Sequence, residues 1–178
     1  MDSMVTRFDD LSYLSGGTDR QRQAYRTLTD SGLMRKLGRF DPILVGTIPI
    51  GIDIESSDLD IICCFEDSSE FRKTLRDLFG SEQGFRASAQ QAQGSLCVTA
   101  NFVLDAFAIE VFGQAVPTRQ QNAYRHMMVE YQLLARHGEA FRQRIIALKR
   151  QGYKTEPAFA KALGLSGDPY LALLQLGD

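Results

Sequence analysis

Residues 46–62 constrain the fold of this chain more than any other segment. They read GTIPIGIDIESSDLDII, a bend with two glycines followed by two carboxylates in Asp-x-Asp spacing. Side chains on a strand alternate between two faces, so Asp58 and Asp60 are expected to project together. The opposite face would be buried, because it carries Leu59, Ile61, Cys63 and Phe65. The segment therefore predicts a strand that presents two acids on one face of a sheet.

Two carboxylates this close repel each other unless a cation lies between them. Sites made only of oxygen ligands favour hard divalent cations, above all Mg²⁺ where phosphates complete the coordination shell. Gly51 would let the backbone approach such a ligand closely. The pattern therefore indicates a metal–phosphate site, with an ordinary solvent-exposed strand edge as the alternative.

Length and composition predict one compact unit. The 178 residues suit an α/β core over 1–116 with a C-terminal helical extension over 117–178 packed on it. The formal net charge of −2 argues against a general nucleic-acid binder. No apolar run is long enough to cross a bilayer, and the N-terminus lacks the layout of a signal peptide. Three cysteines without metal-ligand spacing indicate reduced thiols and a cytoplasmic protein.

Periodicity and capping patterns predict an alternation of helices and strands. Helices are expected over 18–30, 33–37 and 68–79, and strands over 42–47, 58–65, 85–90, 95–103 and 107–112. An irregular turn is expected over 48–54, and hairpin turns at Gln93-Gly94 and Leu104-Asp105. The tail would be helical, with helices capped by Thr118, Thr155 and Asp168 and a break at Gly138. This order predicts an α/β (α+β) fold, a mixed sheet flanked by helices.

The order Gly46-Thr47, then Gly51, then Ser57-Asp58-Leu59-Asp60-Ile61 resembles the signature of the DNA polymerase β-type nucleotidyltransferase superfamily. That signature has Gly-Ser or Gly-Gly, a further Gly, and Asp-x-Asp framed by apolar residues. The spacing is similar to that of the minimal nucleotidyltransferases and of an uncharacterised bacterial branch of the superfamily. Thr47 replaces the usual Ser, and Ile48-Pro49-Ile50 stand where many minimal members carry arginines.

The resemblance implies a nucleotidyltransferase-like sheet and a third carboxylate on a later strand. Glu110 fits this role, because it lies in the strand-like run 107–112. Asp105 is the competing acid, but it lies where the hairpin should turn. By the resemblance, Asp58, Asp60 and Glu110 would be catalytic residues and would bind two Mg²⁺ ions, with a nucleoside triphosphate such as ATP as substrate.

The resemblance also implies a grip on the triphosphate. Gly46, Thr47, Gly51 and Ser57 would bind phosphate oxygens from the bend. The helical tail is rich in basic residues, of which Lys149 and Lys154 are the candidates for reaching the nucleotide. For most of these cations a solvent-exposed helix face is the better explanation.

The function that follows is Mg²⁺-dependent transfer of a nucleoside monophosphate to a hydroxyl of a small molecule or protein. The acidic overall charge makes a nucleic-acid acceptor unlikely, and nothing indicates a membrane. The main alternative is a catalytically inactive, antitoxin-like interaction module with a protein partner. The remaining alternative is an α/β domain whose acids are only surface charges.

Overall fold

The computed structural model describes residues 6–92 and 94–177, and these residues form two compact units. The first unit contains the chain up to Val45 and residues 58–118, including the whole sheet. The second contains residues 46–57 and the chain from Arg119 onwards. The predicted fold class is confirmed, since a mixed sheet is flanked by helices and the C-terminal end is helical.

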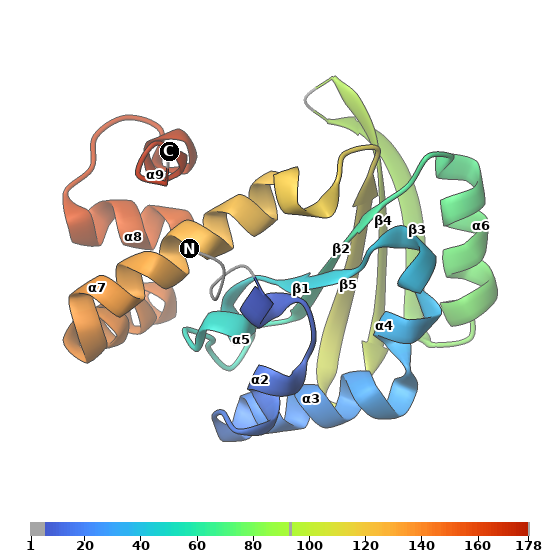
Figure 1. Ribbon diagram of the computed structural model, residues 1–178, viewed down its shortest axis with the longest axis horizontal. Coiled ribbons are helices and arrows are strands. Elements are labelled where there is room, and N and C mark those ends of the chain that lie inside the picture. The colour runs from blue at the N-terminus through green and yellow to red at the C-terminus, as the bar shows by residue number, and fades with distance from the viewer. Residues whose placement is uncertain (1–5, 93, 178) are drawn as a thin grey trace. The chain divides into compact units, whose positions relative to one another are not determined.

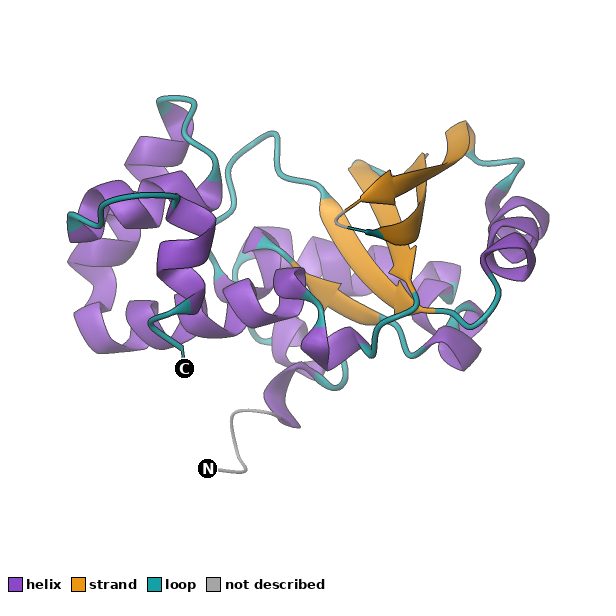
Figure 2. Ribbon diagram, turned by 90° about the horizontal axis from the view of Figure 1, so that it is seen from above, coloured by secondary structure: helices purple, strands orange, loops and turns teal. Residues whose placement is uncertain are grey.

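Five strands form one sheet in the order β1-β2-β5-β4-β3 (Figure 1). Their bounds are β1 Ile43–Val45, β2 Leu59–Cys64, β3 Gln83–Ala92, β4 Ser95–Leu104 and β5 Phe107–Gln114. β2 and β5 run parallel, whereas the other neighbours are antiparallel. The orange strands in Figure 2 show the twist of this sheet. The predicted β3–β4 turn includes Gln93, which lies outside the described residues.

Helices and single turns surround or follow the strands. Before β2 come η1 Thr6–Phe8, α2 Ser12–Ser15, α3 Asp19–Ser31, α4 Leu33–Lys36, η2 Gly38–Phe40 and α5 Thr47–Ile50. Later come α6 Ser68–Phe79, η3 Thr118–Gln120, α7 Asn122–Arg150, α8 Thr155–Leu163 and α9 Pro169–Leu174. In the described part of the chain, no helix combines the length and apolarity needed to span a bilayer.

Helices α3 and α6 pack on the same face of the sheet. The Phe79 ring of α6 stacks on Phe102 of β4, with centroids 4.8 Å apart. The Arg20 guanidinium of α3 lies over the Phe107 ring of β5, 3.9 Å from its centroid. Side chains that alternate with Phe102 and Phe107 therefore point to the opposite face. The apolar face predicted for β2 is buried as expected, with Leu59, Ile61, Cys63 and Phe65 at most 5% exposed.

Local capping explains where several helices begin. Helix α3 begins with a capping box, because Thr18 accepts from the Gln21 backbone and the Gln21 side chain accepts from the Thr18 backbone. Asp67 caps α6 and Asp168 caps α9 through their carboxylates. Each cap satisfies helix N–H groups that have no partner within the first turn.

Three local predictions were wrong. Residues 47–50 form the short helix α5 instead of an irregular turn, because Pro49 lies in its first turn, where a missing N–H is tolerated. Thr118 does not cap α7, because its hydroxyl donates to Asp41, and Gln121 occupies the N-cap position without a side-chain cap. The N-cap of α8 is Lys154, one residue before the predicted Thr155.

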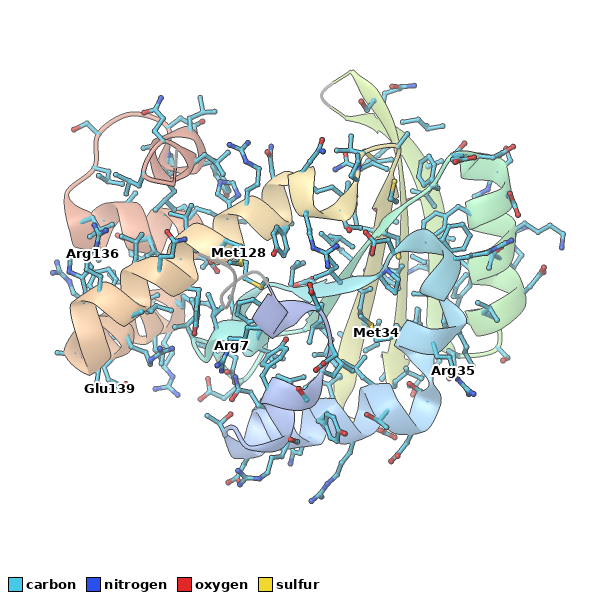
Figure 3. The ribbon with its side chains drawn as sticks, in the orientation of Figure 1. Arg7, Met34, Arg35, Met128, Arg136 and Glu139 are labelled. Carbon is cyan, nitrogen blue, oxygen red and sulfur yellow. The ribbon has the colours of Figure 1, made fainter. Side chains whose placement is uncertain are left out.

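Helix α7 contains the predicted break at Gly138. That residue has φ 75° and ψ −168°, a backbone conformation that residues with a Cβ avoid. Figure 3 labels Arg136 and Glu139, which lie on either side of the break. The second half of α7 packs on α8, where the rings of Phe141 and Phe159 meet edge to face at 5.8 Å.

Helix α7 also buries a carboxyl group, that of Glu130, which is 3% exposed. Burial raises its pKa well above the usual range; Glu156 of α8 raises this pKa further, whereas Lys149 lowers it. The neighbouring His126 imidazole lies 3.8 Å from the Glu156 carboxylate. The second unit thus buries Glu130, Lys149 and His126, with the half-buried Glu156 beside them.

The raised pKa predicts pH-dependent stability. Below the ordinary carboxyl pKa of about 4.3 the proton on Glu130 stabilises the folded state fully, and this contribution is lost as pH rises through the higher folded-state pKa. Glu130→Gln cannot titrate, so its melting temperature relative to wild type should rise between pH 4 and pH 8. The slope is limited to about 1.4 kcal/mol per pH unit. Glu139→Gln, on the exposed part of α7, is the control, and a flat difference for Glu130→Gln would contradict the raised pKa.

Candidate active site

A row of side chains crosses the sheet face opposite α3 and α6. Asp60 of β2 is the register partner of Glu110 of β5, and Glu110 is the partner of Asn101 of β4. The row continues to Val45 of β1 on one side and Arg86 of β3 on the other. Register partners point to the same face, so these five side chains lie side by side across the sheet.

The two acids of the row come from neighbouring backbone positions. Adjacent strands are about 4.8 Å apart, which places the Asp60 and Glu110 backbones at about that separation. Both side chains are half-buried, between fully covered apolar neighbours on the same strands. Asp60 and Glu110 therefore form a carboxylate pair that is fixed by the rigid centre of the sheet and is still accessible from one side.

Asn101 is a member of the row that sequence reasoning missed. Its side-chain amide donates to Glu110 Oε2 at 3.2 Å. The bond orients the Glu110 carboxylate and leaves its other oxygen for a further ligand. The sequence signal was a polar residue inside the apolar alternation of strand 95–103, and its meaning depends on a register that only the structure gives.

The two remaining acids considered from the sequence lie outside the strands. Asp58 is exposed and precedes β2 by one residue. Asp105 lies in the β4–β5 turn with φ 50°, and its carboxylate accepts from the Thr27 hydroxyl at 2.6 Å. Asp105 thus fixes α3 to the hairpin turn, whereas Glu110 lies on the strand, where the sequence placed it.

The chemistry of the acids fits a divalent cation, because Asp60 and Glu110 offer carboxylate oxygens from adjacent strands. Within residues 6–92 and 94–177, however, no three side chains of His, Cys, Asp or Glu lie close enough together to hold an ion. The convergence of Asp58, Asp60 and Glu110 on one ion therefore stays a prediction.

The bend residues predicted to bind phosphate belong to the second unit. Gly46 has φ 86° and ψ −151°, a conformation that requires glycine. Gly51 ends α5 in the left-handed region, with φ 68°. The Thr47 hydroxyl donates to Ser57 Oγ at 3.2 Å, and the Ile54 amide donates to the same oxygen at 2.9 Å. The two ends of this connection are therefore linked to each other.

The two candidate lysines lie in different environments. Lys149 is 7% exposed, and its Nζ donates to the Ile52 carbonyl at 2.9 Å. Lys154 is exposed at the start of α8. Of these two lysines, it is Lys154 that has its charge at the surface of the second unit, where an anion can approach it.

A cavity of about 560 Å³ lies in the first unit, away from the acid row. It is lined by residues of α2, α3, α4 and β1, including Tyr25, Met34 and Leu44. Leu44 pairs with Ile61, so its side chain lies on the face opposite Asp60. The cavity is therefore separate from the candidate active site.

The chain matches a family model and several solved structures. Residues 26–176 match the model described as "Domain of unknown function (DUF4269)". A search of curated proteins finds no significant match.

Among solved structures, Cid1, described by its RNA terminal uridylyl transferase activity, superposes with a TM-score of 0.57 at 12% identity, covering 82% of this chain and 48% of Cid1. A MgGTP-bound structure of the Cid1 poly(U) polymerase gives a TM-score of 0.55 at 12% identity, over 82% of this chain and 49% of that one. The GLD-2/RNP-8 complex gives 0.52 at 11% identity, over 90% and 60%.

These structural matches establish the fold. The chain spans about half the length of the Cid1 structures that it matches. At identities this low, the likeness shows that the chain shares the fold of these nucleotidyltransferases. The predicted resemblance to the superfamily is supported as a likeness of fold.

Proposed function

This chain belongs to the DUF4269 family, and we propose that it is a nucleotidyltransferase. It would transfer a nucleoside monophosphate from a nucleoside triphosphate to a hydroxyl group. The observation that carries the proposal is the in-register pair of Asp60 and Glu110, with Asn101 bonded to Glu110, on the sheet face opposite α3 and α6.

In the proposed reaction the acceptor hydroxyl oxygen attacks the α-phosphorus. The bond from that phosphorus to the pyrophosphate oxygen breaks, and the hydroxyl proton is lost to solvent. Asp58, Asp60 and Glu110 would hold two Mg²⁺ ions, which when bound activate the hydroxyl and neutralise charge on the pyrophosphate. Asn101 keeps the Glu110 carboxylate oriented for this role.

The bend would bind the triphosphate. The backbone amides of Gly46 and Thr47 and the hydroxyl of Ser57 are the proposed donors to phosphate oxygens, and Gly51 would let the backbone approach them closely. Lys154, which is exposed, is the proposed cation for the outer phosphates. These groups bind and position the substrate. In such transfers, positioning is the main contribution of the protein to catalysis.

The acceptor is proposed from charge. A net charge of −2 favours a small molecule or a protein hydroxyl over a polynucleotide. Cid1 is described by activity on RNA, so RNA is the second candidate.

The deciding experiment incubates the protein with each α-³²P-labelled nucleoside triphosphate, Mg²⁺ and, separately, an RNA oligonucleotide, a protein extract and a small-molecule extract. Label in the small-molecule or protein fraction supports the proposal. Label only in RNA would mean that RNA is the acceptor instead of a small molecule or protein. No label in any fraction would favour the inactive interaction module.

Asn101→Leu is expected to lower kcat about 10- to 100-fold, the usual cost of losing a partner that orients a metal-binding carboxylate. Thr99→Val is the matched control, because Thr99 lies on the same face of β4, two residues before Asn101 and opposite Phe112. Steady-state kinetics of both variants test this. Equal rates for Asn101→Leu and wild type would show that Asn101 does not act on Glu110.

A further inference from the structure

The connection between β1 and β2 is held in the second unit by two basic side chains of α7. Arg142 Nη1 donates to the carbonyls of Ile50 and Gly51, the latter at 3.1 Å. Lys149 Nζ donates to the carbonyl of Ile52 at 2.9 Å. Three successive carbonyls therefore accept hydrogen bonds from two cations, and these bonds fix the middle of the connection.

The Lys149 ammonium is buried at a position where an apolar side chain would have a smaller desolvation cost. It is 7% exposed and acts electrostatically on Glu130, which is itself 3% exposed. Burying an ammonium group is costly unless good partners compensate it. Lys149 follows Arg142 by two helical turns, so both side chains leave the same face of α7. The hydrogen bond to the Ile52 carbonyl is one of the interactions that compensate this cost.

The ends of the same connection are fixed as well. Thr47 and Ser57 are hydrogen-bonded to each other, and the Ile54 amide donates to Ser57. Gly46 follows the last residue of β1, and Asp58 follows Ser57 directly. Fixing the backbone at 50–52 therefore also restricts Gly46, Thr47 and Ser57 within the same connection.

We propose that Arg142 and Lys149 are positioning residues that set the conformation of the phosphate-binding connection. They act through the backbone of residues 50–52 instead of touching the nucleotide. The role in nucleotide binding rests on the proposed function, whereas the clamp on the connection does not depend on it. The helical tail then contributes to the site by shaping the bend more than by supplying charge to the phosphates.

The test compares Lys149→Met and Arg142→Gln with Arg150→Gln. Arg150 also contacts the connection, through Glu55 at 2.8 Å, but both side chains are more than half exposed, and such pairs contribute little. Hydrogen exchange of the amides in 46–57 should accelerate about tenfold or more in the first two variants and stay unchanged in the third. The KM for the nucleoside triphosphate should rise about tenfold or more in the first two variants, with a smaller change in kcat.

The outcomes separate the clamp from the proposed function. Unchanged exchange over 46–57 in Arg142→Gln, which is partly exposed and so the safer variant to fold, would overturn the clamp. Faster exchange with an unchanged KM would overturn its role in nucleotide binding. If the variants exchange faster but the wild type shows no transfer and binds no nucleotide, the proposed function is overturned and the clamp stays in place.

Discussion

Asp60→Asn is expected to lower nucleotidyl transfer at least about a thousandfold, because it removes one of the charges that balance a divalent cation and the triphosphate. Asp60 lies at the centre of the sheet with Glu110 as its register partner. The exchange keeps the size and shape of the side chain, so the loss should appear in the rate while the melting temperature stays near that of wild type. Steady-state transfer from α-labelled triphosphate and a thermal melt together measure both quantities.

Two further acids make this result specific. Glu110→Gln should cause a loss of similar size, because it removes the partner carboxylate. Asp105→Asn is the matched control, since asparagine also accepts from Thr27 and tolerates the positive φ of that turn. A loss in Asp105→Asn as large as that in Glu110→Gln would show that the wrong acid was assigned to the site.

The second large effect concerns stability. Gly113 of β5 lies against Phe71 of α6, and an alanine Cβ at that position would overlap the Phe71 ring. The ring cannot move aside easily, because it is fully buried and packs against Phe40 and Phe65, with centroids 4.7 Å and 5.4 Å away. Gly113→Ala should therefore cost about 1–3 kcal/mol of unfolding free energy.

For a chain of this length that cost corresponds to a fall of about 2–12 °C in melting temperature. Gly16→Ala is the control, because nothing lies within 4 Å of a Cβ at that position. Calorimetry or circular dichroism measures both variants. If Gly113→Ala melted with the wild type, α6 would not pack on β5 as described.

Local chemistry made much of the fold predictable. Strand β2 followed from the alternation of apolar residues with Asp60, and helix α6 followed from a capping residue at Asp67 or Ser68, because both signals lie within a few residues of sequence. Glu110 could be preferred over Asp105 for the same reason, since one lies in a strand pattern and the other at a turn. Near-neighbour patterns decide such features before any tertiary contact forms.

Three features that sequence reasoning missed depend on contacts between distant residues. Asn101 acquires its meaning from the β4–β5 register. Thr118 has a capping pattern, but its hydroxyl donates to Asp41, 77 residues away in the sequence. The sequence makes Lys149 a candidate for reaching the nucleotide, yet it is buried against a carbonyl 97 residues earlier. Periodicity gives the face of a helix, and it does not give the partner that the face meets.

The central claim is that Asp60 and Glu110 form a metal–nucleotide site. Crystals grown with Mn²⁺ and a non-hydrolysable nucleoside triphosphate test it most directly through anomalous scattering. The expected result is a manganese peak about 2.0–2.2 Å from carboxylate oxygens of both Asp60 and Glu110, with the triphosphate beside it. A nucleotide bound elsewhere, or manganese that contacts neither carboxylate, would contradict the claim.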